Sequence, residues 1–201
     1  MTPQETHAWL TDVLGPMELL NVNGMVIGSA TVVPSAVSVG FGEVDNGLVV
    51  DVTRQESGVA NAESAGTDID VYTGPMDVRC EIICAAEGAT AQQRVMAVAG
   101  AWNTLVVAGI PGQPGIALPG LVNDPELTVC HGILREPQIF DRGTPLVRES
   151  AAGNRNARMT LLLELILLTD DEYGIAASQG LDVMERRMHR RRSNLGDWVR
   201  G

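Results

Sequence analysis

Residues 74–109 read GPMDVRCEIICAAEGATAQQRVMAVAGAWNTLVVAG, and this stretch decides the fold. Its first part alternates apolar and polar residues, which predicts a strand with side chains on two opposite faces. We expect the apolar set to face a core and Asp77, Arg79 and Glu81 to face water. Ile83 breaks the alternation, so the end of this strand is expected to be buried on both faces.

A helix is predicted directly after this strand, over residues 90–108. Thr90 suits the N-cap position, because its hydroxyl can accept a hydrogen bond from the free amides of the first turn. Apolar residues then recur at the spacing of one helix face, and they are Val95, Val98, Ala99, Trp102, Leu105 and Val106. Gly109 and Pro111 end the helix.

A second helix is predicted near the start of the chain, over residues 3–14. Thr2 is the N-cap, Pro3 takes the first helical position, and Glu5 completes a capping box. Strands are predicted near residues 37–41, 48–55, 68–84, 127–140 and 158–169, and Asp45-Asn46-Gly47 is interpreted as the hairpin turn between the first two. The last strand is apolar on both faces, which indicates a central place in the sheet.

These elements together predict an α+β fold. We expect a small antiparallel or mixed sheet with the helices at 3–14 and 90–108 packed on one face. Extended loops are expected at 55–67 and 110–125, where turn-forming residues replace any apolar period. Residues 1–174 are interpreted as a single α+β domain, and residues 175–201 as a C-terminal helical and basic arm.

The charge of the chain is unevenly distributed. The net charge is −11, all 14 basic residues are arginine, and there is no lysine. Residues 182–201 hold six of these arginines and only three acids. An acidic body argues against a protein that wraps nucleic acid, and the missing lysine excludes a Schiff base or a P-loop. A basic tail on an acidic body suits docking onto an acidic neighbour, including a second copy.

The basic tail also carries residue types that are enriched where proteins touch. We therefore predict an assembly interface made of Arg186, Arg187, Arg190, Arg191, Arg192, Leu195 and Trp198. Nucleic-acid binding by these arginines is the weaker interpretation, since acids lie among them and aromatic residues do not.

No catalytic or metal site is predicted. Cys80 and Cys84 lie on one strand, roughly 13 Å apart, too far for a disulfide. Cys130 and His131 are adjacent residues of a predicted strand, so their side chains are expected to diverge rather than to bind zinc. Asp68 and Asp70 are interpreted as a solvated strand face. We expect no enzyme activity, no cofactor, no signal peptide and no membrane span.

Several stretches in this order resemble the tail terminator proteins of long-tailed actinobacterial phages. The resemblance covers about residues 20–169, and its matching stretches are 39–41, 70–82, 91–101, 123–127 and 158–167. These motifs consist of spacing and residue type rather than a unique signature. The C-terminal arm departs from the shorter members of that family.

The resemblance implies a structural virion protein that assembles in the host cytoplasm. Such a subunit forms a homo-oligomeric ring, expected to be a hexamer, on the finished tail tube. The ring ends tube polymerisation and joins the tail to the neck and head, while DNA passes through its lumen without specific binding. Three alternatives remain open: another neck or tail-tube component, a DNA-binding module that uses the C-terminal arginines, and a small hydrolase.

Overall fold

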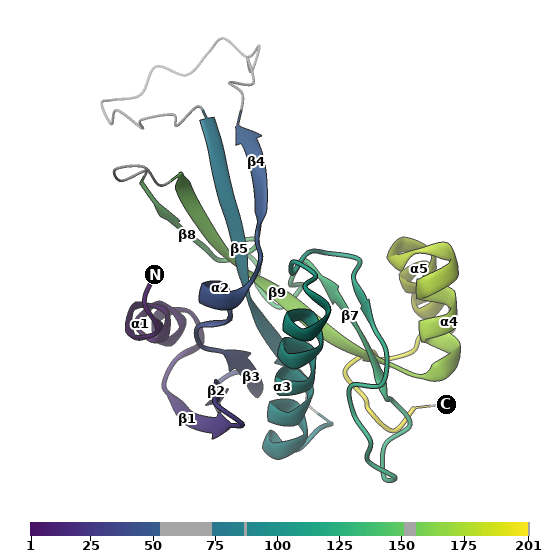
Figure 1. The fold of residues 1–201 in the computed structure, drawn as a ribbon. Coiled ribbons are helices and arrows are strands. Elements are labelled where there is room, and N and C mark those ends of the chain that lie inside the picture. The colour runs from purple at the N-terminus through teal and green to yellow at the C-terminus, as the bar shows by residue number, and fades with distance from the viewer. Residues whose placement is uncertain (53–73, 87, 151–155, 201) are drawn as a thin grey trace.

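The computed structural model describes residues 1–52, 74–86, 88–150 and 156–200. Its strands are β1 (Met17–Val22), β2 (Met25–Ala30), β3 (Ser35–Ser38), β4 (Leu48–Val52), β5 (Gly74–Ala85), β6 (Ala117–Leu118), β7 (His131–Arg135), β8 (Leu146–Glu149) and β9 (Ala157–Leu168). They form one sheet in the order β1-β2-β3-β5-β9-β7-β6, with β4 added to β5 and β8 to β9 (Figure 1). The predicted α+β class is confirmed.

Both predicted helices are present. They are α1 (Pro3–Leu14) and α3 (Ala91–Ala108). Each begins with a threonine N-cap whose hydroxyl accepts from the backbone amide three residues later, at 3.3 Å for Thr2 and 3.2 Å for Thr90. α3 ends at Gly109, which takes the left-handed conformation at φ 64°. The local signals of the sequence therefore set both helices correctly.

The two helices pack on opposite faces of the sheet, so the prediction of one shared face is wrong. Ile82 joins the buried cluster under α3, whereas its neighbour Ile83 joins the cluster under α1. Adjacent strand residues point to opposite faces, which separates the two helices. Helices α4 (Asp170–Gln179) and α5 (Leu181–Arg191) share the face of α1, at the other end of the sheet, where they pack on Ile133, Ile166 and Leu168.

Strands β5 and β9 are long parallel neighbours that pass through two different environments. Their C-terminal halves lie between the helices. Their N-terminal halves pair with β4 and β8 and extend beyond the helices (Figure 1). These four strand segments, in the order β4-β5-β9-β8, are called the blade below.

Two strand predictions and one loop prediction differ from the structure. β4 pairs with β5, not with β3, because the short helix α2 (Phe41–Val44) separates β3 from β4. The predicted strand over 127–140 is reduced to β7. The loop at 110–125 contains β6, which pairs with β7. The loop at 55–67 and residues 68–73 of the strand predicted over 68–84 lie outside the described residues.

The C-terminal segment is packed into this fold. Trp198 shares a buried cluster with Trp102 and Leu167, and the Arg200 guanidinium pairs with the Glu172 carboxylate at 2.7 Å. Both charged side chains of this pair are buried. Among the described helices, none combines the length and the apolar character needed to cross a bilayer.

Candidate assembly surfaces

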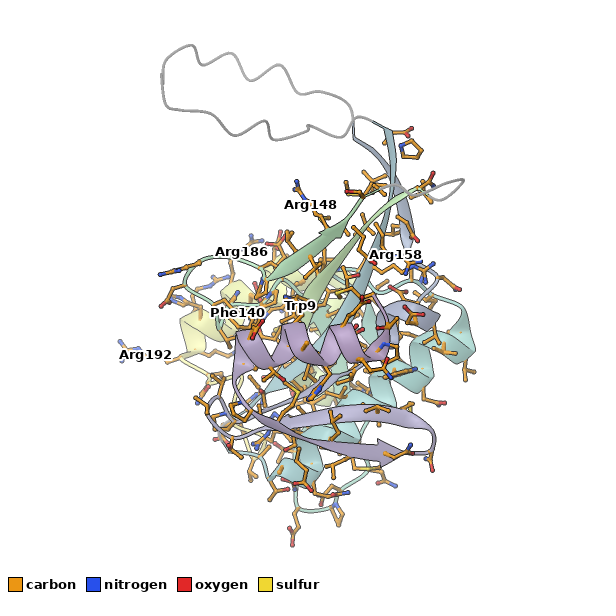
Figure 2. The ribbon with its side chains drawn as sticks, turned by 90° about the vertical axis from the view of Figure 1, so that its left-hand side faces the viewer. Trp9, Phe140, Arg148, Arg158, Arg186 and Arg192 are labelled. Atoms are coloured by element: carbon orange, nitrogen blue, oxygen red, sulfur yellow. The ribbon has the colours of Figure 1, made fainter. Side chains whose placement is uncertain are left out.

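Helix α5 presents the predicted arginines to solvent. Met184 and Met188 are buried against the sheet and fix the orientation of the helix. Arg186 and Arg190 lie on the opposite side of the helix, and all five arginines of residues 186–192 except the half-buried Arg187 are exposed. Arg192 points away from the body of the molecule (Figure 2). We call this set the basic strip, and it consists of Arg186, Arg187, Arg190, Arg191 and Arg192.

The basic strip has no acidic partner within the described part of its own chain. Arg187 donates to the side-chain oxygen of Gln179 at 2.7 Å, and Arg190 donates to the backbone oxygen of Arg186 at 3.3 Å. The recorded ion pairs of arginine use other residues instead, namely Arg79, Arg135, Arg158 and Arg200. The strip is therefore a positive surface without an ion pair among the described residues, with Asp182 as the acidic neighbour of Arg186 on the same side of α5.

The two apolar residues predicted for this interface lie elsewhere. Trp198 is only 1% exposed and belongs to the core on the α3 side, so the prediction that it faces a partner is wrong. Leu195 is half-buried and packs against the cluster under α4 and α5. A tryptophan near the end of a basic segment fits an interface by residue type, but here the chain folds it back onto its own sheet.

The opposite end of the sheet is acidic. No lysine or arginine precedes Arg54 in the sequence. Glu5 and Asp12 on α1 and Glu18 on the edge strand β1 are all exposed, and we call these three residues the acidic end. Within the described residues, Asp12 and Glu18 form no ion pair, whereas Glu5 is engaged in the capping box of α1.

One face of the blade is apolar except for Arg148, which lies opposite Met159, and the other face is charged. Strand register places Val50 and Met76 on the same face, together with the partly exposed Leu146. The complete apolar set is Leu48, Val50, Met76, Val78, Leu146, Met159 and Leu161. The other face carries charged side chains, among them Asp77, Arg79 and Arg158. The helices lie beside the other half of the sheet (Figure 1), so they do not cover the apolar face.

A third surface is uncharged. No charged residue occurs between Arg94 and Asp124, a stretch that includes most of α3. Val106 and Val107 on the outer side of α3 are exposed, Val107 by 79%. Beside them, a groove of about 420 Å³ runs between α3 and the β1–β2 hairpin, and its apolar lining includes Val22, Met25 and Leu121.

A buried carboxylate lies where the sequence predicts a water-facing one. Glu81 is 1% exposed and accepts hydrogen bonds from the Ser38 hydroxyl at 2.5 Å and from three backbone amides at 3.0–3.1 Å, those of Gly40, Phe41 and Gly42. Burial raises the pKa of Glu81 to about 7, while these hydrogen bonds act in the opposite direction. Because α2 covers this position, strand alternation alone could not reveal the burial. Glu81 ties α2 to the sheet.

Cys130, His131 and Asp170 converge, contrary to the sequence prediction. Their ligand atoms lie within 4.8 Å of one another. Cys130 precedes β7 rather than belonging to it, so strand alternation does not separate it from His131. The His131 Nε2 atom lies 2.8 Å from Asp170 Oδ1, and the ring stacks on Tyr173 with 4.2 Å between centroids.

The hydrogen bonds of this cluster do not fit a metal ion. The Gly120 amide donates to His131 Nδ1 at 3.0 Å, so Nδ1 carries the lone pair and Nε2 of the neutral ring carries the proton that faces Asp170. A metal on Nε2 would require a proton on Nδ1, which would face the Gly120 donor.

The cluster does not fit an activated thiol either. Desolvation and the Asp170 charge raise the pKa of Cys130, which disfavours the thiolate. The hydrogen-bond partner of the Cys130 thiol is Asp170 Oδ1, at 3.7 Å, and not the imidazole, whereas a nucleophilic thiol is hydrogen-bonded to its base. The contacts between His131 and Asp170 attach α4 to β7.

The chain was compared with protein-family models, curated proteins and solved structures, and none of the three comparisons gives a match.

Proposed function

We propose that the chain is a ring-forming virion subunit, a tail terminator that caps the tail tube, ends its growth and joins the tail to the neck. The observation that carries this proposal is the blade, whose two edge strands are both unpaired on their outer sides within the described residues. An exposed edge offers backbone donors and acceptors to a strand of another molecule. Because one subunit has two such edges, each subunit can pair with two neighbouring subunits.

The strand directions favour a closed ring. β4 is antiparallel to β5, β8 is antiparallel to β9, and β5 is parallel to β9, so β4 and β8 run in the same direction. A rotation about an axis near the strand direction preserves that direction. The β8 edge of one copy can therefore meet the β4 edge of the next in parallel, and repetition of this head-to-tail contact generates a ring if the rotation closes.

The charge balance suits a ring around DNA. A net charge of −11 weakens nonspecific attraction to phosphate, so DNA can slide through a lumen without sticking. The apolar face of the blade and the uncharged face of α3 leave surfaces for the tail tube and neck proteins. Another neck or tail-tube component would use the same surfaces, and this assignment remains the nearest alternative within the class.

The test is tail-tube growth in the presence of the purified protein. Tube protein from the same virion is polymerised with and without this chain, and tube lengths and ends are examined by negative-stain electron microscopy. We expect shorter tubes that carry an extra ring of density at one end. Tubes of unchanged length without added density would contradict the terminator role. Added subunits along the whole tube would instead indicate a tube component.

A DNA-binding module is the second candidate, favoured by the exposed basic strip. It predicts binding to duplex DNA with an affinity that falls steeply as salt rises, because bound arginines release counterions from the phosphates. Fluorescence anisotropy with a labelled duplex tests this directly. The acidic remainder of the chain leads us to expect no more than weak binding.

A further inference from the structure

We propose that the basic strip of one copy docks on the acidic end of the next copy. This inference rests on the proposed ring and deepens it, since it names the two surfaces that meet between neighbouring subunits. The partner is a second copy of this chain, and charge complementarity identifies the contact.

The basic strip forms no ion pair within the described part of its own chain. The chain has 25 acids against 14 arginines, yet each arginine that forms an ion pair among the described residues lies outside the strip. Arg186 and Arg190 are four residues apart on α5, so they lie on one side of the helix. The buried methionines hold this helix in place, which gives the strip a fixed orientation.

The acidic end is the complementary surface. Glu5, Asp12 and Glu18 come from a region that contains no lysine or arginine, and the N-terminal ammonium of Met1 pairs with Glu149 rather than with these three carboxylates. Asp12 lies in the last turn of α1, and the side chain of Glu18 on β1 faces the α3 side of the sheet, so the two carboxylates lie on either side of this terminal edge. Since β1 is a terminal strand of the sheet, nothing in the described sheet covers it on its outer side.

The two surfaces lie at opposite ends of the molecule. α1 and β1 belong to one end of the sheet, and α5 packs beside β7 near the other end (Figure 1). A contact between them is therefore head-to-tail, as a ring requires, and not the self-complementary contact of a two-fold dimer. The two edges of the blade are arranged in the same way. The β4 edge lies on the side of β5 that leads to the acidic end, and the β8 edge lies on the side of β9 that leads to the basic strip.

The expected contact is salt-sensitive. Single exposed ion pairs contribute little, but several charges of one sign facing the other sign steer association and select the orientation. At about 1 M salt the screening length falls to roughly 3 Å, and such a contact weakens strongly. A head-to-tail contact built only on apolar surface would not weaken in this way.

Charge reversal on both surfaces tests the proposal. The first variant carries Arg186→Glu and Arg190→Glu, and the second carries Asp12→Arg and Glu18→Arg. Self-association of each full-length variant is measured by mass photometry at about 0.1 M salt, after circular dichroism has verified folding. The control reverses an exposed arginine that lies outside both α5 and the blade, with Arg142→Glu.

We expect wild type and the control to form the same oligomer, each reversed variant alone to remain monomeric, and an equal mixture of the two to recover oligomers. In the mixture, the native strip of the second variant meets the native acidic end of the first. The reversed, negative strip of the first variant meets the reversed, positive end of the second, so both contacts pair opposite charges. Oligomers from either variant alone, or no recovery on mixing, would overturn this contact and leave the tube-capping proposal intact. A wild-type chain that stays monomeric at low salt also overturns it, and tube growth then decides the proposed function separately.

Discussion

The two halves of the sheet, the one between the helices and the blade, differ in how much of their surface the chain itself buries. In the half between the helices, β5 and β9 are buried on both faces, with Ile82, Ile83 and Leu162 all fully enclosed. In the blade, Val49 and Val50 on the edge strand are exposed, by 69% and 46%. Strands β5 and β9 thus pass from a fully buried core into a blade whose edge residues are exposed to solvent. We infer that the first half provides stability and that the second is completed by other molecules.

The largest expected effect on stability comes from the C-terminal end of the core. Trp198→Ala should lower the free energy of unfolding by about 4 kcal/mol, because a fully buried tryptophan leaves a cavity. Denaturant unfolding followed by circular dichroism measures this. The neighbouring Val199→Ala is the control, since Val199 is exposed and its truncation should change the value by less than about 0.5 kcal/mol. Equal effects of the two variants would show that the C-terminal segment is not part of the core.

The next largest effect is expected at Glu81. Glu81→Ala removes the shared acceptor of the Ser38 hydroxyl and three backbone amides, and it should cost about 3 kcal/mol in the same unfolding assay. Glu81→Gln retains one carbonyl oxygen and should cost less. A neutral Glu81→Ala variant would contradict the role of this carboxylate in tying α2 to the sheet.

Glu81 also predicts a dependence of stability on pH. Its pKa is about 7 in the folded protein against an ordinary value of 4.5, so the folded state holds a proton that the unfolded chain has released. The free energy of unfolding should therefore fall as pH rises from about 4.5 to about 7, by about 3 kcal/mol in total. Unfolding across this range, compared with Glu81→Gln, isolates the effect. A slope that is unchanged in the glutamine variant would assign it to other groups.

The smallest effect on stability is expected in the blade. Val50→Thr should change the free energy of unfolding by less than about 0.5 kcal/mol, because the side chain is partly exposed in the free chain. The same substitution should weaken assembly if the apolar face of the blade is covered there. Val49→Thr on the opposite, charged face is the control, and it should leave assembly unchanged. A large loss of stability from Val50→Thr would remove the distinction between the two halves.

The sequence predicts the parts of the fold that depend on local signals. The capping box at Thr2 and the N-cap at Thr90 predict the starts of their helices, and the apolar run of β9 indicates its central position. Strand partners depend on distant residues instead, so the hairpin expected at Asp45-Asn46-Gly47 is replaced by pairing of β4 with β5. The burial of Glu81 and Trp198 is likewise invisible locally, because α2 and the fold-back of the C-terminal segment create it.

The candidate surfaces also include features that the sequence alone predicts and features that depend on the tertiary fold. Charge is readable from composition, and the exposed arginines of α5 occupy the positions that their spacing predicts. The opposite location of the acidic end requires the sheet order, since Asp12 and Arg186 could have been neighbours in another topology. The convergence of Cys130 with His131 was missed because it depends on where β7 begins.

Hydrogen–deuterium exchange of the free and the assembled protein tests the central claim most directly. The amides of β4 and β8 should exchange rapidly in the dilute free chain, and they should become protected when the chain is bound to the end of a tail tube. The C-terminal half of β5 should be protected in both states. Unchanged exchange in β4 and β8 on assembly, or new protection confined to other segments, would contradict the claim that the blade is completed by neighbouring molecules.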